Sequence, residues 1–193
     1  MISQSAYQRA AAKLGLSVAH IRAIYEVESQ GEGFFDDGQV KILFERHIFY
    51  RQLVKNKSQA YADLVHRSTP DLCNPQRGGY GKFSEQHPKL QRAVKIDRKS
   101  ALEACSWGAP QVLGANWADM GYSSVQELVN DAFTDDGQLE LLVRFLQANP
   151  AIIRAAAQQN WPEVARRYNG PDYLANKYDT KLASAFDKWR NMA

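Results

Sequence analysis

The chain has 193 residues, of which 45% are apolar and 23% are charged. These values are ordinary for a globular protein and exclude extended disorder and a collagen-like or low-complexity chain. The net charge is +3, but residues 41 to 99 hold 13 Lys and Arg against 5 Asp and Glu, a local charge of +8. Such asymmetry is typical either of a protein that meets a polyanion, such as nucleic acid or a bacterial envelope polymer, or of a solvated basic face without a partner.

Cysteine and histidine usage gives no sign of a metal site or of an obligatory disulfide. Cys73 and Cys105 have no CxxC spacing, and the four histidines are scattered, so we expect buried or free thiols, no metal and no cofactor. The first 16 residues contain Arg9 and Lys13 and no continuous apolar core, so we expect no secretion signal. The longest uncharged run, from 104 to 118, has 15 residues, fewer than the roughly 20 apolar residues of a spanning helix.

Apolar residues recur at helical spacing along most of the chain. The spacing predicts a first helix that stops at Gly15 and a second helix that is capped by Ser17 and ends near Ser29. A turn tripeptide then occupies 36 to 38, and alternating apolar residues follow it at Val40, Ile42 and Phe44. This is the one strand signal, so we expect a single small β-hairpin.

The rest of the chain is again helical in pattern. We expect a helix from 47 to about 68, a loop rich in Pro and Gly from 70 to 82, and a basic helix around 89 to 99. Helix starts are predicted at Ser124, Asn149-Pro150 and Asn160, since each begins with a capping residue. No repeat or linker divides the chain. The sequence therefore predicts a mainly helical single domain over residues 1 to 193.

Two carboxylates lie at the end of the second predicted helix. Glu26 and Glu28 are two residues apart, or roughly 200° around the helix, so they cannot share one task. Glu28 follows Ile24 by four residues and falls beside the apolar stripe, where burial would raise its pKa and keep it protonated, as a general acid requires. The alternatives are a merely solvated Glu28 and a structural or surface Glu26.

The predicted hairpin offers further carboxylates. Asp36 and Asp37 lie at its turn, and Glu45 follows the strand. Two carboxylates that flank one bond are the standard requirement of glycoside hydrolysis. Asp residues also commonly close turns through their own side chains, and Glu45 could instead pair with Arg46 or His47. We therefore retain Glu45 and Asp37 as candidates for the second group, with a slight preference for Glu45.

Two further segments carry side chains that could bind a sugar. Residues 106 to 112 read Ser-Trp-Gly-Ala-Pro-Gln-Val, in which small residues permit close backbone approach and Gln111 offers both a donor and an acceptor. Near the C-terminus, Tyr168 and Asn169 precede Gly170, a residue typical of a helix end. Each segment could equally be a helix boundary with no ligand.

The order of these motifs along the chain resembles the lysozyme superfamily, in particular goose-type lysozymes and soluble lytic transglycosylases. Those motifs are Glu28-Ser29 before a glycine-containing loop, Ser-x-Gly-x-x-Gln at 106 to 111, and Tyr-Asn-Gly at 168 to 170. The resemblance is closer to the N-acetylmuramidase family of bacteriophage endolysins. That family is also matched by Asp37-Gly38, by the run from 42 to 49 and by Tyr178-Asp179.

The resemblance implies a mainly α, lysozyme-like α+β fold with a helical lobe and one hairpin beside the cleft. Because no repeat or linker divides the chain, we also expect no separate cell-wall-binding module. The resemblance also implies cleavage of the β-1,4 bond between N-acetylmuramic acid and N-acetylglucosamine in peptidoglycan. Glu28 matches the acid of the Glu-Ser motif. The resemblance further implies that Ser106, Gln111, Tyr168 and Asn169 bind the substrate.

Three alternatives remain open at this level. One alternative is a lytic transglycosylase that acts on the same substrate. Ala109-Pro110 replaces the Leu-Met usual in transglycosylases, so this hypothesis is less favoured but stays open. A non-catalytic peptidoglycan-binding module would use the same polar contacts. A nucleic-acid binder rests only on the local charge, without a base-reading motif. We expect peptidoglycan glycan strands as the partner, no nucleic acid, no stable membrane insertion, and a monomer that accumulates in the host cytoplasm and then reaches the periplasm and cell wall.

Overall fold

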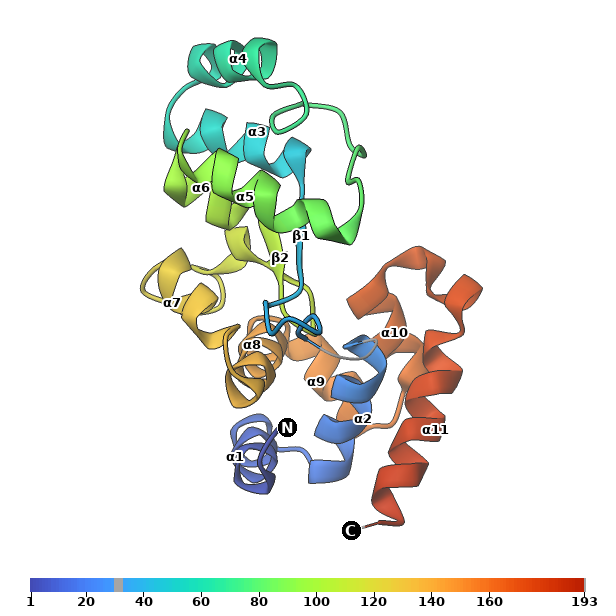
Figure 1. The fold of residues 1–193 in the computed structure, drawn as a ribbon. Coiled ribbons are helices and arrows are strands. Elements are labelled where there is room, and N and C mark those ends of the chain that lie inside the picture. The colour runs from blue at the N-terminus through green and yellow to red at the C-terminus, as the bar shows by residue number, and fades with distance from the viewer. Residues whose placement is uncertain (30–32, 193) are drawn as a thin grey trace.

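The computed structural model describes residues 1–29 and 33–192, so part of the glycine loop expected after the second helix, residues 30–32, lies outside the described residues. Helices dominate the described part, and short strands form a small antiparallel sheet (Figure 1). In chain order the elements are α1 (Gln4–Leu14), α2 (Val18–Glu28), β1 (Ile42–Phe44), α3 (Arg46–Asn56), α4 (Gln59–Ser68), η1 (Phe83–Glu85), α5 (Gln86–Val94), α6 (Arg98–Glu103), β2 (Cys105–Trp107), β3 (Val112–Leu113), η2 (Gly114–Asn116), α7 (Val125–Asp131), α8 (Asp135–Ala148), α9 (Pro150–Ala157), α10 (Trp161–Asn169), η3 (Pro171–Asn176) and α11 (Tyr178–Arg190).

The predicted limits of the first two helices are confirmed by their caps. Gly15 ends α1 with a left-handed backbone, φ 64°, which glycine adopts without a steric penalty. The Ser17 side chain accepts a hydrogen bond from the backbone amide of His20 and so caps α2. Ser29 follows the last residue of α2. The Ser17 cap therefore fixes the start of α2, and the helix ends where the sequence predicts.

Each of the two predicted helices in the middle of the chain is in fact two helices. The segment from 47 to 68 divides into α3 and α4, because Ser58 Oγ accepts from the amide of Tyr61 at 3.2 Å and starts a new helix. The segment from 89 to 99 divides in the same way. There Asp97 Oδ1 accepts from the amide of Ser100 at 2.8 Å and starts α6. Ser and Asp side chains bond free amides at a helix start better than they serve a helix interior.

The sheet is larger than the single hairpin that the sequence predicts. The hairpin turn is present, with a bridge between Phe34 and Val40. However, β1 pairs with the distant β2, in antiparallel register with Ile42 opposite Trp107, and β2 pairs with β3. Strands of two or three residues are too short to show alternation in a sequence, so the 106 to 112 segment gave no strand signal.

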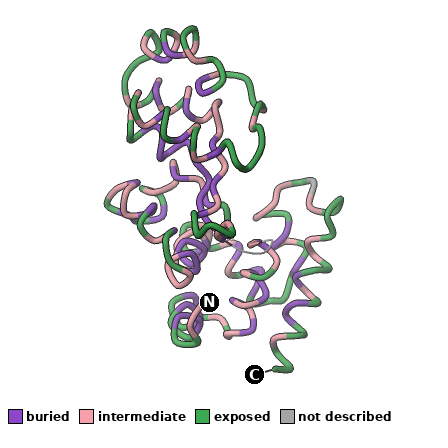
Figure 2. The backbone as a smooth tube through the Cα atoms, in the orientation of Figure 1, coloured by how far each residue is buried: buried purple, intermediate pink, exposed green. Residues whose placement is uncertain are grey.

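Buried apolar side chains of the described residues form two clusters. One cluster surrounds the sheet and α3 to α7, and the other joins α1, α2 and α8 to α11. Figure 2 shows buried stretches along the backbone in both halves. Phe145 on α8 packs against both clusters. Because α2 packs along α11 (Figure 1) and Ile21 and Ile24 are fully buried, the C-terminal end of α2 is firmly positioned.

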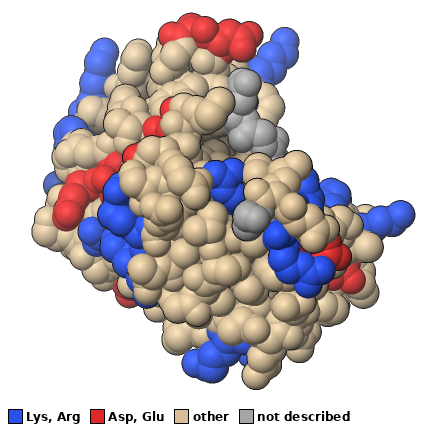
Figure 3. Space-filling view, turned by 90° about the horizontal axis from the view of Figure 1, so that it is seen from below, with Lys and Arg blue, Asp and Glu red and all other residues tan. Residues whose placement is uncertain are grey.

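Surface charge is distributed over several groups. On the face shown in Figure 3, Lys and Arg side chains form separate groups with Asp and Glu between them. Within the basic 41 to 99 segment, Lys57 pairs with Asp97 at 2.8 Å and Arg92 with Asp71 at 2.7 Å. Among the described residues, none of the helices has both the length and the apolar character that a bilayer crossing requires.

Candidate active site

Glu28 is the last residue of α2 and is buried, with 7% of its surface exposed. Its position after the buried Ile24 confirms that it lies on the apolar side of the helix. Burial in this surrounding raises the pKa of Glu28 from 4.5 to about 7, because the charged form loses its hydration. The carboxyl group therefore still carries a proton on a large fraction of molecules at neutral pH.

Asn169 contacts this carboxyl group from the end of α10. Its side-chain Nδ2 donates a hydrogen bond to Glu28 Oε1 at 3.0 Å. The bond favours the charged form and lowers the pKa of Glu28, but desolvation has the larger effect. Asn160 caps the start of α10 and Gly170, with φ 82°, follows its end, so local sequence fixes where Asn169 lies. Two predicted site residues from opposite ends of the chain are thus brought together.

Tyr168 lies next to the same carboxyl group. Its ring meets that of Phe145 edge to face, with centroids 5.0 Å apart. Burial, together with the nearby Glu28, raises the pKa of the Tyr168 hydroxyl well above its ordinary value. The hydroxyl therefore stays protonated at any physiological pH and is able to donate a hydrogen bond.

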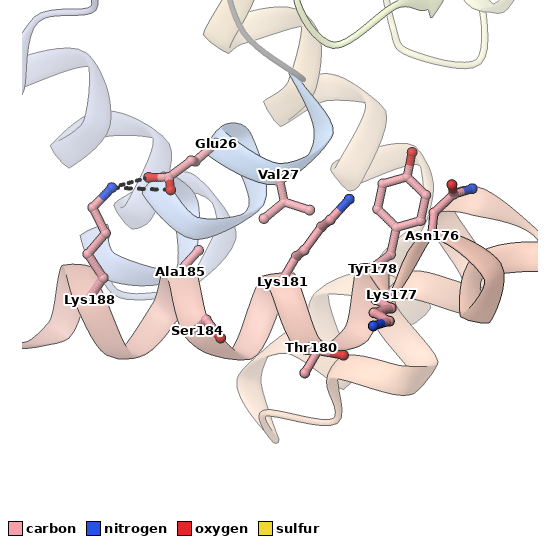
Figure 4. A pocket seen from close by; sticks show the side chains of 10 residues that line it. All are labelled: Glu26, Val27, Asn176, Lys177, Tyr178, Thr180, Lys181, Ser184, Ala185 and Lys188. Carbon is pink, nitrogen blue, oxygen red and sulfur yellow. Dashed lines mark hydrogen bonds and ion pairs between the residues drawn. The ribbon is translucent and has the colours of Figure 1, made fainter.

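Glu26 faces the other way, as its spacing from Glu28 predicts. Its carboxylate accepts from Lys188 Nζ at 2.9 Å and from Trp189 Nε1 at 2.7 Å on α11. It lies at one end of a hollow of about 740 Å³ between α2 and α11, which Figure 4 shows from close by. These partners confirm the interpretation of Glu26 as a hydrogen-bonded surface residue that ties α11 to α2.

Glu45 lies between β1 and α3, with 13% of its side chain exposed. Ser106 on β2 donates its hydroxyl to Glu45 Oε1 at 3.4 Å, and His47 Nε2 lies 3.8 Å from Oε2. Burial lowers the pKa of His47 from its ordinary 6.5, which favours the neutral imidazole over the charged pair with Glu45 that the sequence suggests. The structure thus joins two more predicted site residues, Glu45 and Ser106, through the pairing of β1 with β2.

Asp37 is exposed and engaged within its own turn. Its Oδ1 accepts from the backbone amide of Gln39 at 3.0 Å, and its Oδ2 accepts from the Gln39 side chain at 2.9 Å. This is the turn-closing role that the sequence left open as the alternative. Its neighbour Asp36, which the sequence did not single out from the pair, is the residue that lines the cleft.

A cleft of about 690 Å³ lies where the hairpin, β1, η1 and the loop after β2 meet. Ser29, the residue after Glu28, and Gln111 both line it. Gln111 is exposed and holds a left-handed backbone at φ 49°, and its Nε2 donates to the carbonyl of Gly108 at 2.8 Å. The loop therefore presents Gln111 at the cleft.

Gln138 on α8 is a site residue that sequence reasoning missed. It is 1% exposed. Its Oε1 accepts from the amide of Ala109 at 2.8 Å, and its Nε2 donates to the carbonyls of Ala132 and Gly33 at 2.9 and 3.3 Å. Gly33 also packs so closely that a Cβ there would lie 1.7 Å from Gln138 Oε1. One amide thus links two walls of the cleft. In the sequence, Gln138 precedes Leu141 and Leu142 by three and four residues, so it lies on the same face of α8 as these buried side chains. This spacing could have predicted its burial.

Replacing Gln138 by Leu should destabilise the protein by about 3 kcal/mol, since three buried backbone groups lose their partner and each such loss costs about 1–3 kcal/mol without full additivity. Urea unfolding measures the change in free energy. Gln158→Leu on the exposed end of α9 is the matched control and should change stability little. Equal stability of both variants would show that the Gln138 contacts are not needed.

The two helical lobes around a short sheet, with a buried glutamate at the end of the second helix, define a lysozyme-like protein. The chain belongs to the N-acetylmuramidase family, whose family model matches residues 17–190. Its structure is similar to the crystal structure of the Burkholderia AP3 phage endolysin, with a TM-score of 0.91 and 39% sequence identity over 98% of this chain and 72% of that chain. No curated protein matches the chain.

These comparisons confirm the predicted family and the predicted mainly helical lysozyme-like fold. The chain is a glycoside hydrolase that acts on peptidoglycan. The individual site residues rest on the geometry described above.

Proposed function

We propose that this enzyme hydrolyses the β-1,4 bond between N-acetylmuramic acid and N-acetylglucosamine, with Glu28 as the proton donor. The observation that carries the proposal is the buried Glu28 carboxyl, whose pKa is raised to about 7 and which Asn169 holds at 3.0 Å. A carboxyl with this pKa is protonated often enough to act as an acid and is acidic enough to release the proton.

In the proposed reaction, Glu28 donates its proton to the glycosidic oxygen as the bond to the muramic acid C1 breaks. The N-acetylglucosamine leaves with a neutral hydroxyl, and the remaining ring gains oxocarbenium character. Water then adds at C1 and loses a proton to a carboxylate. Asn169 donates a hydrogen bond to Glu28 Oε1, so the transferable proton is carried by the other oxygen of this carboxyl group. Ser106, Gln111 and Tyr168 are the proposed polar contacts of the glycan.

For the second carboxylate we favour Glu45 over Asp37. The Glu45 side chain is largely shielded and is oriented by Ser106, whereas both oxygens of Asp37 are engaged by Gln39. A fixed carboxylate can stabilise an oxocarbenium ion or activate water without first giving up another bond.

Glu45→Gln is therefore expected to lower kcat/KM on peptidoglycan by about 100-fold, a typical contribution of one positioned acid–base group. Asp37→Asn should stay within a few-fold of the unmodified enzyme. Thermal unfolding of both variants controls for a purely structural effect of Glu45. A larger loss in Asp37→Asn than in Glu45→Gln, at equal stability, would assign the second group to Asp37 instead.

Product analysis tests the proposed reaction itself. Peptidoglycan is digested in water labelled with heavy oxygen, and the muropeptides are examined by mass spectrometry. Hydrolysis should place one labelled oxygen at the reducing end of N-acetylmuramic acid. Anhydro-muropeptides, which lack this water because the 6-hydroxyl of the sugar closes the ring, would show a lytic transglycosylase. Label at the reducing end of N-acetylglucosamine would show that the other bond is cleaved.

We further propose that the enzyme acts as an endolysin, because the AP3 protein to which it is similar carries that name. In that role it accumulates in the host cytoplasm and reaches the cell wall upon release. The single domain over 1 to 193 and the monomeric state remain predictions of the sequence.

A further inference from the structure

Two phenylalanine rings from separate segments stand together at the edge of the cleft. Phe35 belongs to the hairpin turn and Phe83 begins η1. Their ring centroids are 6.2 Å apart, at an interplanar angle of 62°. Phe83 is 70% exposed, although an apolar ring of this size gains free energy when it is buried. Exposed apolar surface that is concentrated within a groove is typical of a ligand contact.

The pair lies between two hollows. Both rings line the 690 Å³ cleft that contains Ser29 and Gln111, and both also line a second hollow of about 540 Å³ on the α5 side. Gln39 and Gln91 contribute amide groups to that second hollow. A ligand that continues from the cleft past the two rings would therefore enter a second polar hollow.

His87 on α5 contacts the hairpin that carries Phe35 and helps to hold the Phe35 ring in place. Its Nε2 lies 2.7 Å from the carbonyl oxygen of Val40 at the base of the hairpin. Its ring meets that of Phe35 edge to face, with centroids 6.4 Å apart. Phe35 is thus supported from one side by His87 and meets Phe83 on another. A supported ring loses little conformational freedom when a ligand binds, so the contact is preorganised.

We propose that Phe83 and Phe35 form a sugar-stacking subsite that binds a pyranose ring of the glycan strand as it leaves the cleft next to Ser29, the residue after Glu28. The inference rests on the proposed function, since a polymeric glycan must continue beyond the bond that is cleaved. A pyranose presents C–H groups on its faces and hydroxyl or N-acetyl groups at its edges. An aromatic ring buries the apolar face, and Gln39 and Gln91 line the adjoining hollow, where the side-chain oxygen of Gln39 and the amide of Gln91 are the groups to meet the polar edges.

The subsite is tested by binding in a Glu28→Gln background, in which cleavage does not consume the ligand. Calorimetry with soluble, uncross-linked glycan strands of defined length should give a Kd about tenfold weaker for Phe83→Ala. Phe83→Trp should restore the affinity, since it retains an aromatic face, whereas Phe83→Leu should not. Phe133→Ala is the matched control, because Phe133 is 60% exposed and lies after α7, and it should bind as the background does.

Two outcomes would overturn the subsite. An unchanged Kd for Phe83→Ala would show that the ring does not meet the glycan, and full affinity of Phe83→Leu would show that apolar bulk rather than stacking matters. Failure of the proposed function is separately visible, because the enzyme with Glu28 intact would then release no muropeptides with labelled oxygen at the reducing end of N-acetylmuramic acid. Thermal unfolding of each Phe83 variant confirms that the fold is retained.

Discussion

Glu28→Gln is expected to lower kcat/KM on peptidoglycan by about 1,000-fold, within the range typical of a positioned general acid. Glutamine keeps the size of the side chain and an oxygen that can accept from Asn169, but it has no proton to donate to a departing sugar. The loss should fall mainly on kcat, because the contacts of the glycan with the cleft remain. Release of soluble muropeptides from purified cell walls measures the rate.

Glu26→Gln is the matched control for this experiment. Glu26 lies on the same helix, two residues earlier, but its carboxylate is paired with Lys188 and Trp189 on α11. It should retain activity within a few-fold. Activity of Glu28→Gln above about one-tenth of the unmodified rate would contradict the role of Glu28 as the acid, as would an equally severe loss in Glu26→Gln at equal stability.

The same substitution is expected to stabilise the protein above neutral pH. The pKa of Glu28 is about 7 in the folded chain against an ordinary 4.5. Between these two values the unfolded chain releases the proton while the folded chain retains it, so folding stability falls as pH rises by up to about 1.4 kcal/mol per pH unit. Above pH 7 both states are ionised and the loss is complete. The total cost of this burial is about 3 kcal/mol.

Urea unfolding of the unmodified protein and of Glu28→Gln at pH 5 and pH 8 measures this cost. The advantage of the variant should widen by about 2.5 kcal/mol between the two pH values. Other titrating groups are common to both proteins and cancel in the difference. A constant difference at both pH values would show that Glu28 has an ordinary pKa. The expected result links activity to a cost in stability, because the burial that retains the proton also penalises the charged form.

Local chemistry made much of the fold predictable. Gly15 and Ser17 mark helix ends through their own backbone and side-chain preferences, and the structure confirms both. Ser58 and Asp97 are also caps, but each lies inside a run with continuous helical spacing, so the sequence predicted one helix where there are two. Short-range signals are reliable where periodicity also ends and are easily overlooked where periodicity continues.

Long-range pairing was the part that residue patterns could not supply. The contact of Glu28 with Asn169 spans 141 residues, and only the order of motifs shared with a known family indicated that the two lie together. The pairing of β1 with β2 was missed because β2 has three residues. Gln138 belongs to no motif that we recognised, and its role appears only when the loops that it bonds are in place.

The protonation state of Glu28 is the central claim, and its titration tests the claim most directly. Glutamate carrying a carbon-13 label in its side-chain carboxyl is incorporated throughout the protein, and the Glu28 resonance is identified by its absence in Glu28→Gln. Its chemical shift is then followed by NMR from acid to alkaline pH. The structure predicts a midpoint at about pH 7. A midpoint near 4.5, the ordinary value of a glutamate side chain, would contradict the proposed mechanism.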